Sequence, residues 1–167
     1  IEAYWLFGVE SDQLDAVIHP QSIVHAMVET LEGSVLMQCA MPDMRTPIQL
    51  ALQYPGRVGG LARRVNLAEH GTLSFEAVDV ARFPAMGFWK RCIGKENGGT
   101  TRGAILNAAN EAAVSRFLDR TQAPIPFGRI TEVVGEVIEA VAPVRIETLN
   151  HVLEADRSAR EAVRKLL

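Results

Sequence analysis

The spacing of apolar residues changes near residue 80, and this change constrains the fold more than any other feature of the chain. Before it, short apolar runs are separated by glycine and proline, which is typical of strands and turns. After it, apolar residues recur every three or four positions, as in amphipathic helices. We therefore expect an α+β chain with two parts: residues 1–80, a piece of a mixed α/β domain that contains a hairpin, and residues 81–167, a helical domain.

The first part contains two consecutive strand-like segments. Residues 23–29 and 34–40 are joined by a short link that contains Gly33, which is hairpin spacing with glycine where a positive φ is needed. Both segments are apolar at nearly every position, whereas a sheet buried on one face alternates. We expect both faces of this sheet to be covered, by helices of this chain, by another part of a longer protein, or by a second subunit.

Capping residues predict the neighbouring elements. Residues 1–7 read as the end of a helix that Gly8 terminates, and the missing start of this helix indicates a piece of a longer chain. Thr46 followed by Pro47 predicts a helix over 47–54 with Thr46 as its N-cap. Further along, the pattern predicts an irregular connector and then a short strand, over 56–72 and 73–78.

The second part is predicted to be a four-helix bundle. Helical spacing of apolar residues covers four segments separated by proline- and glycine-containing links. These segments are 83–95, 102–120, 127–142 and 148–167.

Composition argues against several classes of protein. The 17 basic and 20 acidic residues give a net charge of −3, whereas a dedicated nucleic-acid binder is expected to be basic. No apolar run reaches the roughly 20 residues that a membrane span requires. Cys39 and Cys92 belong to no CxxC or Cys/His cluster, which indicates free thiols in a reducing compartment. We therefore expect neither a nucleic-acid nor a membrane partner.

Two polar segments at the ends of the predicted strands could carry chemistry. His19 and His25 fit either two structural histidines or a metal or acid–base pair that needs a third group from elsewhere. In the segment 42–47, Pro42 and Met44 could line an apolar pocket, or the segment could simply begin a helix with charged residues on its surface.

Two other groups of residues also allow two interpretations. Asn107 and Asn110 share one helix face and could bond another segment across an interface, or hold two helices of the same domain together. The connector carries three arginines that suit either a phosphate site or a solvated loop: Arg57, Arg63 and Arg64.

Several of these motifs together resemble the 1-deoxy-D-xylulose 5-phosphate reductoisomerase family. The resemblance rests on HPQSIVH at 19–25 and PDMRTPI at 42–48, two highly specific blocks. LNAANEA at 106–112 and DRSAR at 156–160 match as well. The resemblance covers essentially the whole chain and about the last two-fifths of the family's length.

The resemblance implies an NADPH-dependent oxidoreductase and isomerase of the methylerythritol phosphate route to isoprenoids. The family converts 1-deoxy-D-xylulose 5-phosphate, a phosphorylated sugar, to 2-C-methyl-D-erythritol 4-phosphate with the help of Mg²⁺, Mn²⁺ or Co²⁺. It also implies a homodimer formed through the sheet. We expect a bacterial cytoplasmic location, with a plastid location as the alternative.

The resemblance also implies which residues remain near the reaction site. The family's NADPH loop and metal-binding carboxylates lie upstream of residue 1, so no metal ligand is assigned here, and this chain alone is predicted to bind neither cofactor and to be inactive. His25 is expected to orient the substrate or a metal-binding carboxylate, Ser22 to bind substrate, and Pro42 and Met44 to lie on the nicotinamide side.

A second function class stays open beside the enzyme. The same pattern suits a stand-alone dimerisation or interaction module, in which an apolar sheet pairs with a partner and carries a helical bundle.

Overall fold

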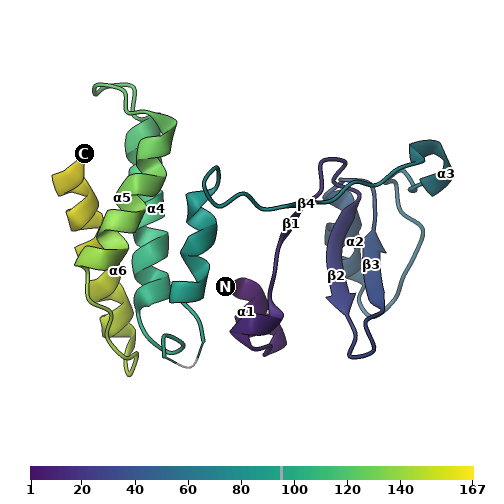
Figure 1. Ribbon diagram of the computed structural model, residues 1–167, viewed down its shortest axis with the longest axis horizontal. Coiled ribbons are helices and arrows are strands. Elements are labelled where there is room, and N and C mark those ends of the chain that lie inside the picture. Colours follow the sequence, from purple (N-terminus) through teal and green to yellow (C-terminus); the bar gives the residue numbers. More distant parts are fainter. Residues whose placement is uncertain (95) are drawn as a thin grey trace. The chain divides into compact units, whose positions relative to one another are not determined.

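The computed structural model describes residues 1–94 and 96–167 and contains two compact units. The hairpin unit comprises residues 16–77, and the helical unit comprises residues 1–15 together with 78–167. Figure 1 shows the elements of both. This grouping differs from the predicted division into 1–80 and 81–167 at its N-terminal end. The first residues pack in the helical unit, where a Cβ added at Gly94 would lie 3.3 Å from Ser11 Oγ.

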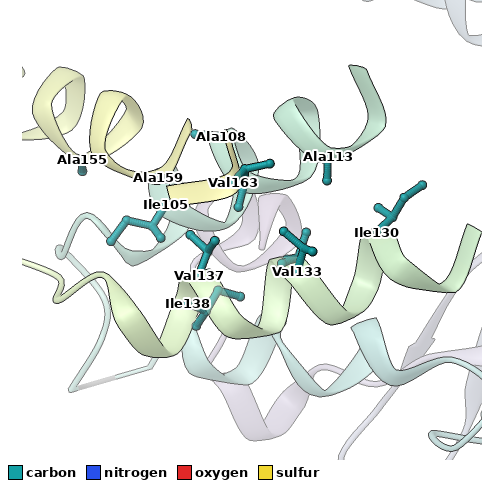
Figure 2. Packing of buried hydrophobic residues seen from close by; sticks show 12 residues of the cluster. Ile105, Ala108, Ala113, Ile130, Val133, Val137, Ile138, Ala155, Ala159 and Val163 are labelled. Atoms are coloured by element: carbon teal, nitrogen blue, oxygen red, sulfur yellow. The ribbon is translucent and has the colours of Figure 1, made fainter. Parts of the chain in front are cut away.

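Three α-helices form the core of the helical unit, as predicted for these segments. They are α4 (Arg102–Leu118), α5 (Phe127–Ala140) and α6 (Leu149–Leu166), and α4 packs against both others. Figure 2 shows their apolar side chains pointing toward one another. The residues of this core that are entirely buried are Ile105, Ala108, Ala109, Ala113, Val133, Val137 and Ala159. The small alanines on α4 and α6 let these two helices approach closely, while valines and isoleucines of α5 fill the remaining space.

The predicted helix over 83–95 is wrong. The described part of this segment forms two 3₁₀ turns, η2 (Pro84–Gly87) and η3 (Trp89–Arg91), and residue 95 lies outside the described residues. Their hydrogen bonds span three residues, as from Cys92 N to Trp89 O at 2.9 Å, because proline and glycine in η2 disfavour a continuous α-helix. The described residues of the helical unit therefore do not form a bundle of four long helices.

A buried threonine joins the end of α5 to the start of α4. Thr101 is fully buried, and its Oγ1 accepts from Val144 N at 3.0 Å while its own N donates to Val144 O at 2.9 Å. The hydroxyl oxygen and the backbone N–H are thus satisfied, and the backbone carbonyl accepts from Ile105 N at 3.0 Å, which offsets the cost of desolvating these groups.

The first residues form α1 (Glu2–Phe7), followed by the 3₁₀ turn η1 (Ser11–Gln13). Gly8 has φ 64° and its N–H donates to Tyr4 O, which confirms the predicted glycine cap.

The predicted hairpin is confirmed in the hairpin unit. Strand β2 (Val24–Glu29) pairs antiparallel with β3 (Val35–Cys39), and Gly33 takes φ 85° in the turn between them. A second, two-residue ladder pairs β1 (Val17–Ile18) with β4 (Glu76–Ala77), so the predicted strand over 73–78 is shorter than expected.

Two helices follow the hairpin. Helix α2 (Arg45–Gln53) lies where a helix was predicted, and α3 (Leu67–His70) is a short helix inside the segment predicted to be irregular. Asn66 caps α3 by accepting a hydrogen bond from Ala68 N at 3.2 Å.

The faces of the hairpin are largely open. Ile23 and Val24 are the buried hydrophobic residues of the described hairpin unit, whereas Val28 and Leu36 are 60% and 64% exposed. Within the described hairpin unit, α2 and α3 therefore leave these strand faces largely open, although helices of this chain were one of the three expected sources of cover.

Two further expectations concern the chain as a whole. Cys39 and Cys92 are free thiols, and burial raises the pKa of the Cys92 thiol. Among the described residues, no helix is both long and apolar enough to cross a membrane.

Candidate functional site: a basic groove in the hairpin unit

A groove of about 1090 Å³ lies within the hairpin unit, and we call it the basic groove. Its walls come from the end of β3, from α2 and from the connector between α2 and α3. It contains three of the four site residues predicted from sequence, namely His25, Pro42 and Met44. It also contains the three arginines of the connector, Arg57, Arg63 and Arg64.

His25 reaches the groove because it occupies an irregularity in β2. Val24 pairs with Cys39 and Ala26 pairs with Gln38, so His25 is an extra residue between two successive pairs. Such a bulge re-aims a side chain relative to the regular alternation. The residue is exposed.

The hydrogen bond of His25 determines which ring nitrogen stays available. His25 Nε2 lies 3.1 Å from Ala40 O, and a carbonyl oxygen can only accept, so Nε2 is the donor. In the neutral ring Nδ1 is then an acceptor, and the described residues provide no hydrogen bond to it. A ligand hydroxyl could use this nitrogen.

The other histidine of the motif has a structural role. His19 Nδ1 lies 2.8 Å from Ser74 O, and its ring stacks on Phe75 at 4.7 Å between centroids. Gln21 Nε2 donates to Ser74 Oγ at 2.8 Å, and Gln21 Oε1 accepts from Ser74 N at 3.2 Å. The first half of HPQSIVH therefore fastens the chain before β2 to the chain before β4. The structural interpretation holds for His19, whereas His25 lines the groove.

Ser22 lies outside the set of residues that line the groove. It forms the predicted turn, with φ 51° and a hydrogen bond from its N to His19 O at 3.0 Å. Its side chain is exposed, and its predicted contact with substrate stays a prediction.

The start of α2 differs from the expectation that Thr46 would cap it. The Asp43 carboxylate accepts from Arg45 N at 2.9 Å and also binds the Arg45 guanidinium through Oδ2, 2.6 Å from Nη2. The helix therefore begins at Arg45, two residues earlier than predicted, and Thr46 lies in its first turn. The hydrogen bond from Arg45 lowers the pKa of the Asp43 carboxyl below its usual value. This pairing leaves Pro42 and Met44 on either side of Asp43 as apolar groups at the groove, with Met44 70% exposed.

Gln49 holds the connector against α2, and sequence reasoning missed it. Its Nε2 donates to Val58 O at 3.2 Å and to Gly59 O at 3.1 Å. A Cβ added at Gly60 would collide with Gln49 Oε1, so the absence of a side chain there permits the close approach. The adjacent Gly59 and Gly60 were the one available signal, because paired glycines often mark a place where backbone meets another group.

The described residues contain no cluster of three or more His, Cys, Asp or Glu side chains that could hold a metal ion. The polar residues of the LNAANEA motif serve the helical unit instead. Asn107 Nδ2 donates to Glu111 Oε1 at 3.2 Å, and Arg160 Nη2 donates to Glu111 Oε2 at 2.6 Å. Arg160 on α6 also bonds Asp156 through Nε at 2.8 Å. Glu111 of the motif thus joins α4 to α6, whereas Asn107 bonds within its own helix, so the roles considered for Asn107 and Asn110 stay a prediction.

The hairpin unit with its groove and the separate helical unit define an α+β chain with a helical domain. The chain also matches a family model described as the DXP reductoisomerase C-terminal domain over residues 39–162, where DXP is 1-deoxy-D-xylulose 5-phosphate. The chain therefore belongs to the DXP reductoisomerase C-terminal domain family.

Similar proteins support this assignment. A relative from Chlorobium limicola named 1-deoxy-D-xylulose 5-phosphate reductoisomerase is 44% identical over 100% of this chain and 42% of its own length. A solved reductoisomerase from Zymomonas mobilis in complex with NADPH has a TM-score of 0.86 at 38% identity, over 99% of this chain and 42% of that one. Another, in complex with NADPH, fosmidomycin and magnesium, has a TM-score of 0.83 at 31% identity, over 98% of this chain and 41% of that one. The chain spans about two-fifths of the length of these proteins.

Proposed function

We propose that this chain is the C-terminal part of an NADPH-dependent reductoisomerase that converts 1-deoxy-D-xylulose 5-phosphate to 2-C-methyl-D-erythritol 4-phosphate in isoprenoid biosynthesis. One observation carries the proposal: residues from HPQSIVH and PDMRTPI line a single groove, in a chain that belongs to the reductoisomerase family. The two motifs are separated in sequence, and the hairpin returns the chain so that both reach the same site.

His25 acts as a positioning residue in this proposal. Its Nε2 donates to Ala40 O, which orients the ring and leaves Nδ1 to accept a hydrogen bond from a substrate hydroxyl. A hydrogen bond that orients a reacting ligand typically affects activity by about 10–100-fold. Ser22 contributes a substrate contact from the preceding turn, where its exposed hydroxyl is available.

Pro42 and Met44 form an apolar wall for the cofactor. Neither side chain competes for hydrogen bonds, and the flexible thioether of Met44 adapts to a flat ring. Bound NADPH supplies the hydride that reduces the rearranged substrate. The groove thus has the apolar surface that a nicotinamide needs beside a residue that orients substrate.

The described residues do not fit a divalent metal site, because no cluster of three or more possible ligands exists among them. We therefore assign no metal ligand in this chain. In the complete enzyme, Mg²⁺, Mn²⁺ or Co²⁺ would be held by residues outside this chain, as would much of the NADPH.

The assembly and location are parts of the same proposal. The open apolar faces of β2 and β3 support a homodimer formed through the hairpin, since a soluble protein rarely leaves such a surface uncovered. We propose a cytoplasmic location in a bacterium.

The test compares this chain with a longer protein that also contains the upstream three-fifths present in the relatives. The longer protein should oxidise NADPH when 1-deoxy-D-xylulose 5-phosphate and Mg²⁺ or Mn²⁺ are supplied, and this chain alone should not. Omission of the sugar phosphate is the control for non-specific oxidation. A longer protein that folds and binds NADPH but does not turn over this sugar phosphate would refute the proposal.

A further inference from the structure

We infer that Gln21 and Ser74 are positioning residues of the proposed enzyme, because together they hold Ser22 in the backbone conformation that presents its hydroxyl to the sugar phosphate. We call this pair of hydrogen-bonded residues the Gln21–Ser74 clamp. The inference rests on the proposed function, since it explains how the substrate contact assigned there to Ser22 is fixed.

Ser22 has a backbone conformation that a serine does not favour. Among the described residues it is the one residue other than glycine with a positive φ, at 51°. In this left-handed region the Cβ of an L-residue lies too close to the following carbonyl oxygen, so the conformation persists only where the surrounding structure enforces it. Glycine would adopt the same turn without this strain. The turn therefore carries an exposed hydroxyl at a position where glycine would be the easier residue.

The clamp fixes the chain on the N-terminal side of Ser22. Gln21 Nε2 donates to Ser74 Oγ at 2.8 Å, and Gln21 Oε1 accepts from Ser74 N at 3.2 Å. His19 Nδ1 donates to Ser74 O at 2.8 Å, so the hydroxyl, the N–H and the carbonyl of Ser74 all bond this one motif. These bonds are partly buried, where water competes less for them.

The buried Ile23 fixes the chain on the other side. Its side chain is 2% exposed, and its carbonyl accepts from Ala40 N at 2.9 Å. The Ala40 carbonyl in turn accepts from His25 Nε2 at 3.1 Å. Ser22 therefore lies between two fixed neighbours, and these neighbours rather than its own preference determine its φ.

The clamp does more than join two segments of the hairpin unit. The ladder of β1 and β4, which pairs Val17 with Ala77 and Ile18 with Glu76, already joins the same two stretches of chain. The clamp adds its bonds directly beside the strained residue, and the strain coincides with an exposed hydroxyl. This placement indicates that the clamp fixes the position of Ser22.

The experiment is a double-mutant cycle of Gln21→Leu and Ser22→Ala in the complete protein. We expect each single variant to lower kcat/KM for the sugar phosphate on the order of tenfold, as for one lost hydrogen bond. The double variant should lose little more than either one, because the clamp acts through Ser22. The KM for NADPH should change by less than about twofold. Losses that multiply to about a hundredfold in the double variant would refute the inference.

A further variant tests the strain at Ser22. Ser22→Gly should lower kcat/KM for the sugar phosphate as much as Ser22→Ala does, because both lack the hydroxyl. Its Tm should be higher than that of Ser22→Ala, because glycine accepts a φ of 51° without strain. Full activity of Ser22→Gly would overturn the inference.

Two comparisons show whether the clamp itself is responsible. Ser74→Thr keeps the hydroxyl and should retain kcat/KM within about twofold, whereas Ser74→Ala should reproduce the loss of Gln21→Leu. Gln122→Leu is the matched control, because Gln122 Nε2 donates to Asp119 Oδ2 at 2.7 Å in the helical unit. It should leave kcat/KM unchanged, and a loss as large as that of Gln21→Leu would contradict the positioning role.

Two outcomes separate this inference from the proposed function. If the complete protein is active and Gln21→Leu keeps its kcat/KM for the sugar phosphate, the positioning role is refuted and the reductoisomerase assignment stands. If the complete protein has no reductoisomerase activity, the proposed function fails, and hydrogen exchange over residues 19–25 tests the clamp directly. Exchange that is about tenfold faster in Gln21→Leu would support a turn held by the clamp, and unchanged exchange would refute it.

Discussion

The two units of this chain use their apolar residues in opposite ways. In the helical unit, the apolar stripes of α4, α5 and α6 face one another and form a closed core with several residues at zero exposure. In the hairpin unit, nearly all apolar residues of β2 and β3 are partly or mostly exposed. The helical unit therefore contains its own stabilising core, whereas most apolar side chains of the hairpin strands stay exposed to solvent. The basic groove lies in the hairpin unit, which has fewer buried apolar residues.

The largest effect on stability is expected from a charge placed in the core of the helical unit. Val137→Asp introduces a carboxylate with no partner at a fully buried position. It should lower the free energy of unfolding by about 3–5 kcal/mol and unfold the helical unit. Circular dichroism during urea denaturation measures this decrease in the free energy of unfolding. As a control, Leu52→Asp on α2, at a position that is 82% exposed and outside the two hairpin strands, should leave the midpoint nearly unchanged. Equal losses for both variants would contradict the contrast between the units.

The next prediction tests the hairpin as a dimer surface. Val35→Asp changes a residue that is 46% exposed, so it should spare the fold but weaken the homodimer of the complete protein by about a hundredfold. Sedimentation at several concentrations measures the dissociation constant. Val24→Asp is less informative, because Val24 is 8% exposed and its loss would also destabilise the hairpin unit itself. A dimer as tight as that of the parent would show that this surface is covered by something else.

The third prediction tests the proposed role of His25 in the basic groove. His25→Gln should lower kcat of the complete enzyme by about 10–100-fold, because glutamine cannot reproduce the orientation of the ring at the bulge. Its stability and dimerisation should stay the same, since His25 is exposed and bonds only a backbone carbonyl. Steady-state kinetics should show the loss in kcat rather than in the KM for NADPH. Full activity at every metal concentration would instead support a structural role.

The smallest effect concerns the polar link between α4 and α6. Hydrogen bonds from Arg160 lower the pKa of the Asp156 and Glu111 carboxyls below their usual values of 3.8 and 4.5. A depressed carboxyl pKa adds stability above the unfolded-state pKa, and this stability is lost as the pH falls through the folded-state value. Arg160→Ala should therefore lower Tm slightly at neutral pH, and the difference from the parent should shrink below pH about 4.

Thermal denaturation from pH 7 to pH 3 checks this prediction. Arg129→Ala is a matched control for a surface pair within α5, since Arg129 bonds Glu132 and Glu136 on its own helix and joins no second helix. A Tm difference for Arg160→Ala that is as large at pH 3 as at pH 7 would indicate lost packing rather than lost ion pairs.

Much of the candidate site could be predicted because its motifs are local and specific. HPQSIVH and PDMRTPI mark the turn before β2 and the entry to α2, and three of their four selected residues line the groove. Gln49 was not predictable, because its importance depends on backbone carbonyls nine and ten residues further along the chain. The position of His25 at a β-bulge was not predictable, because a bulge depends on pairing between strands and leaves no clear periodic signal.

The sequence by itself determined where the long elements lie. Apolar periodicity located α4, α5 and α6, glycine at a positive φ ended α1 and formed the hairpin turn, and both signals are local. Only the tertiary structure decided that residues 84–91 form 3₁₀ turns and that the Asp43 carboxylate, rather than Thr46, accepts from the first N–H of α2. It also decided that the connector arginines and His25 line one groove. These features depend on hydrogen bonds and packing between separate segments, and a local pattern carries no information about which distant atom will satisfy a given donor.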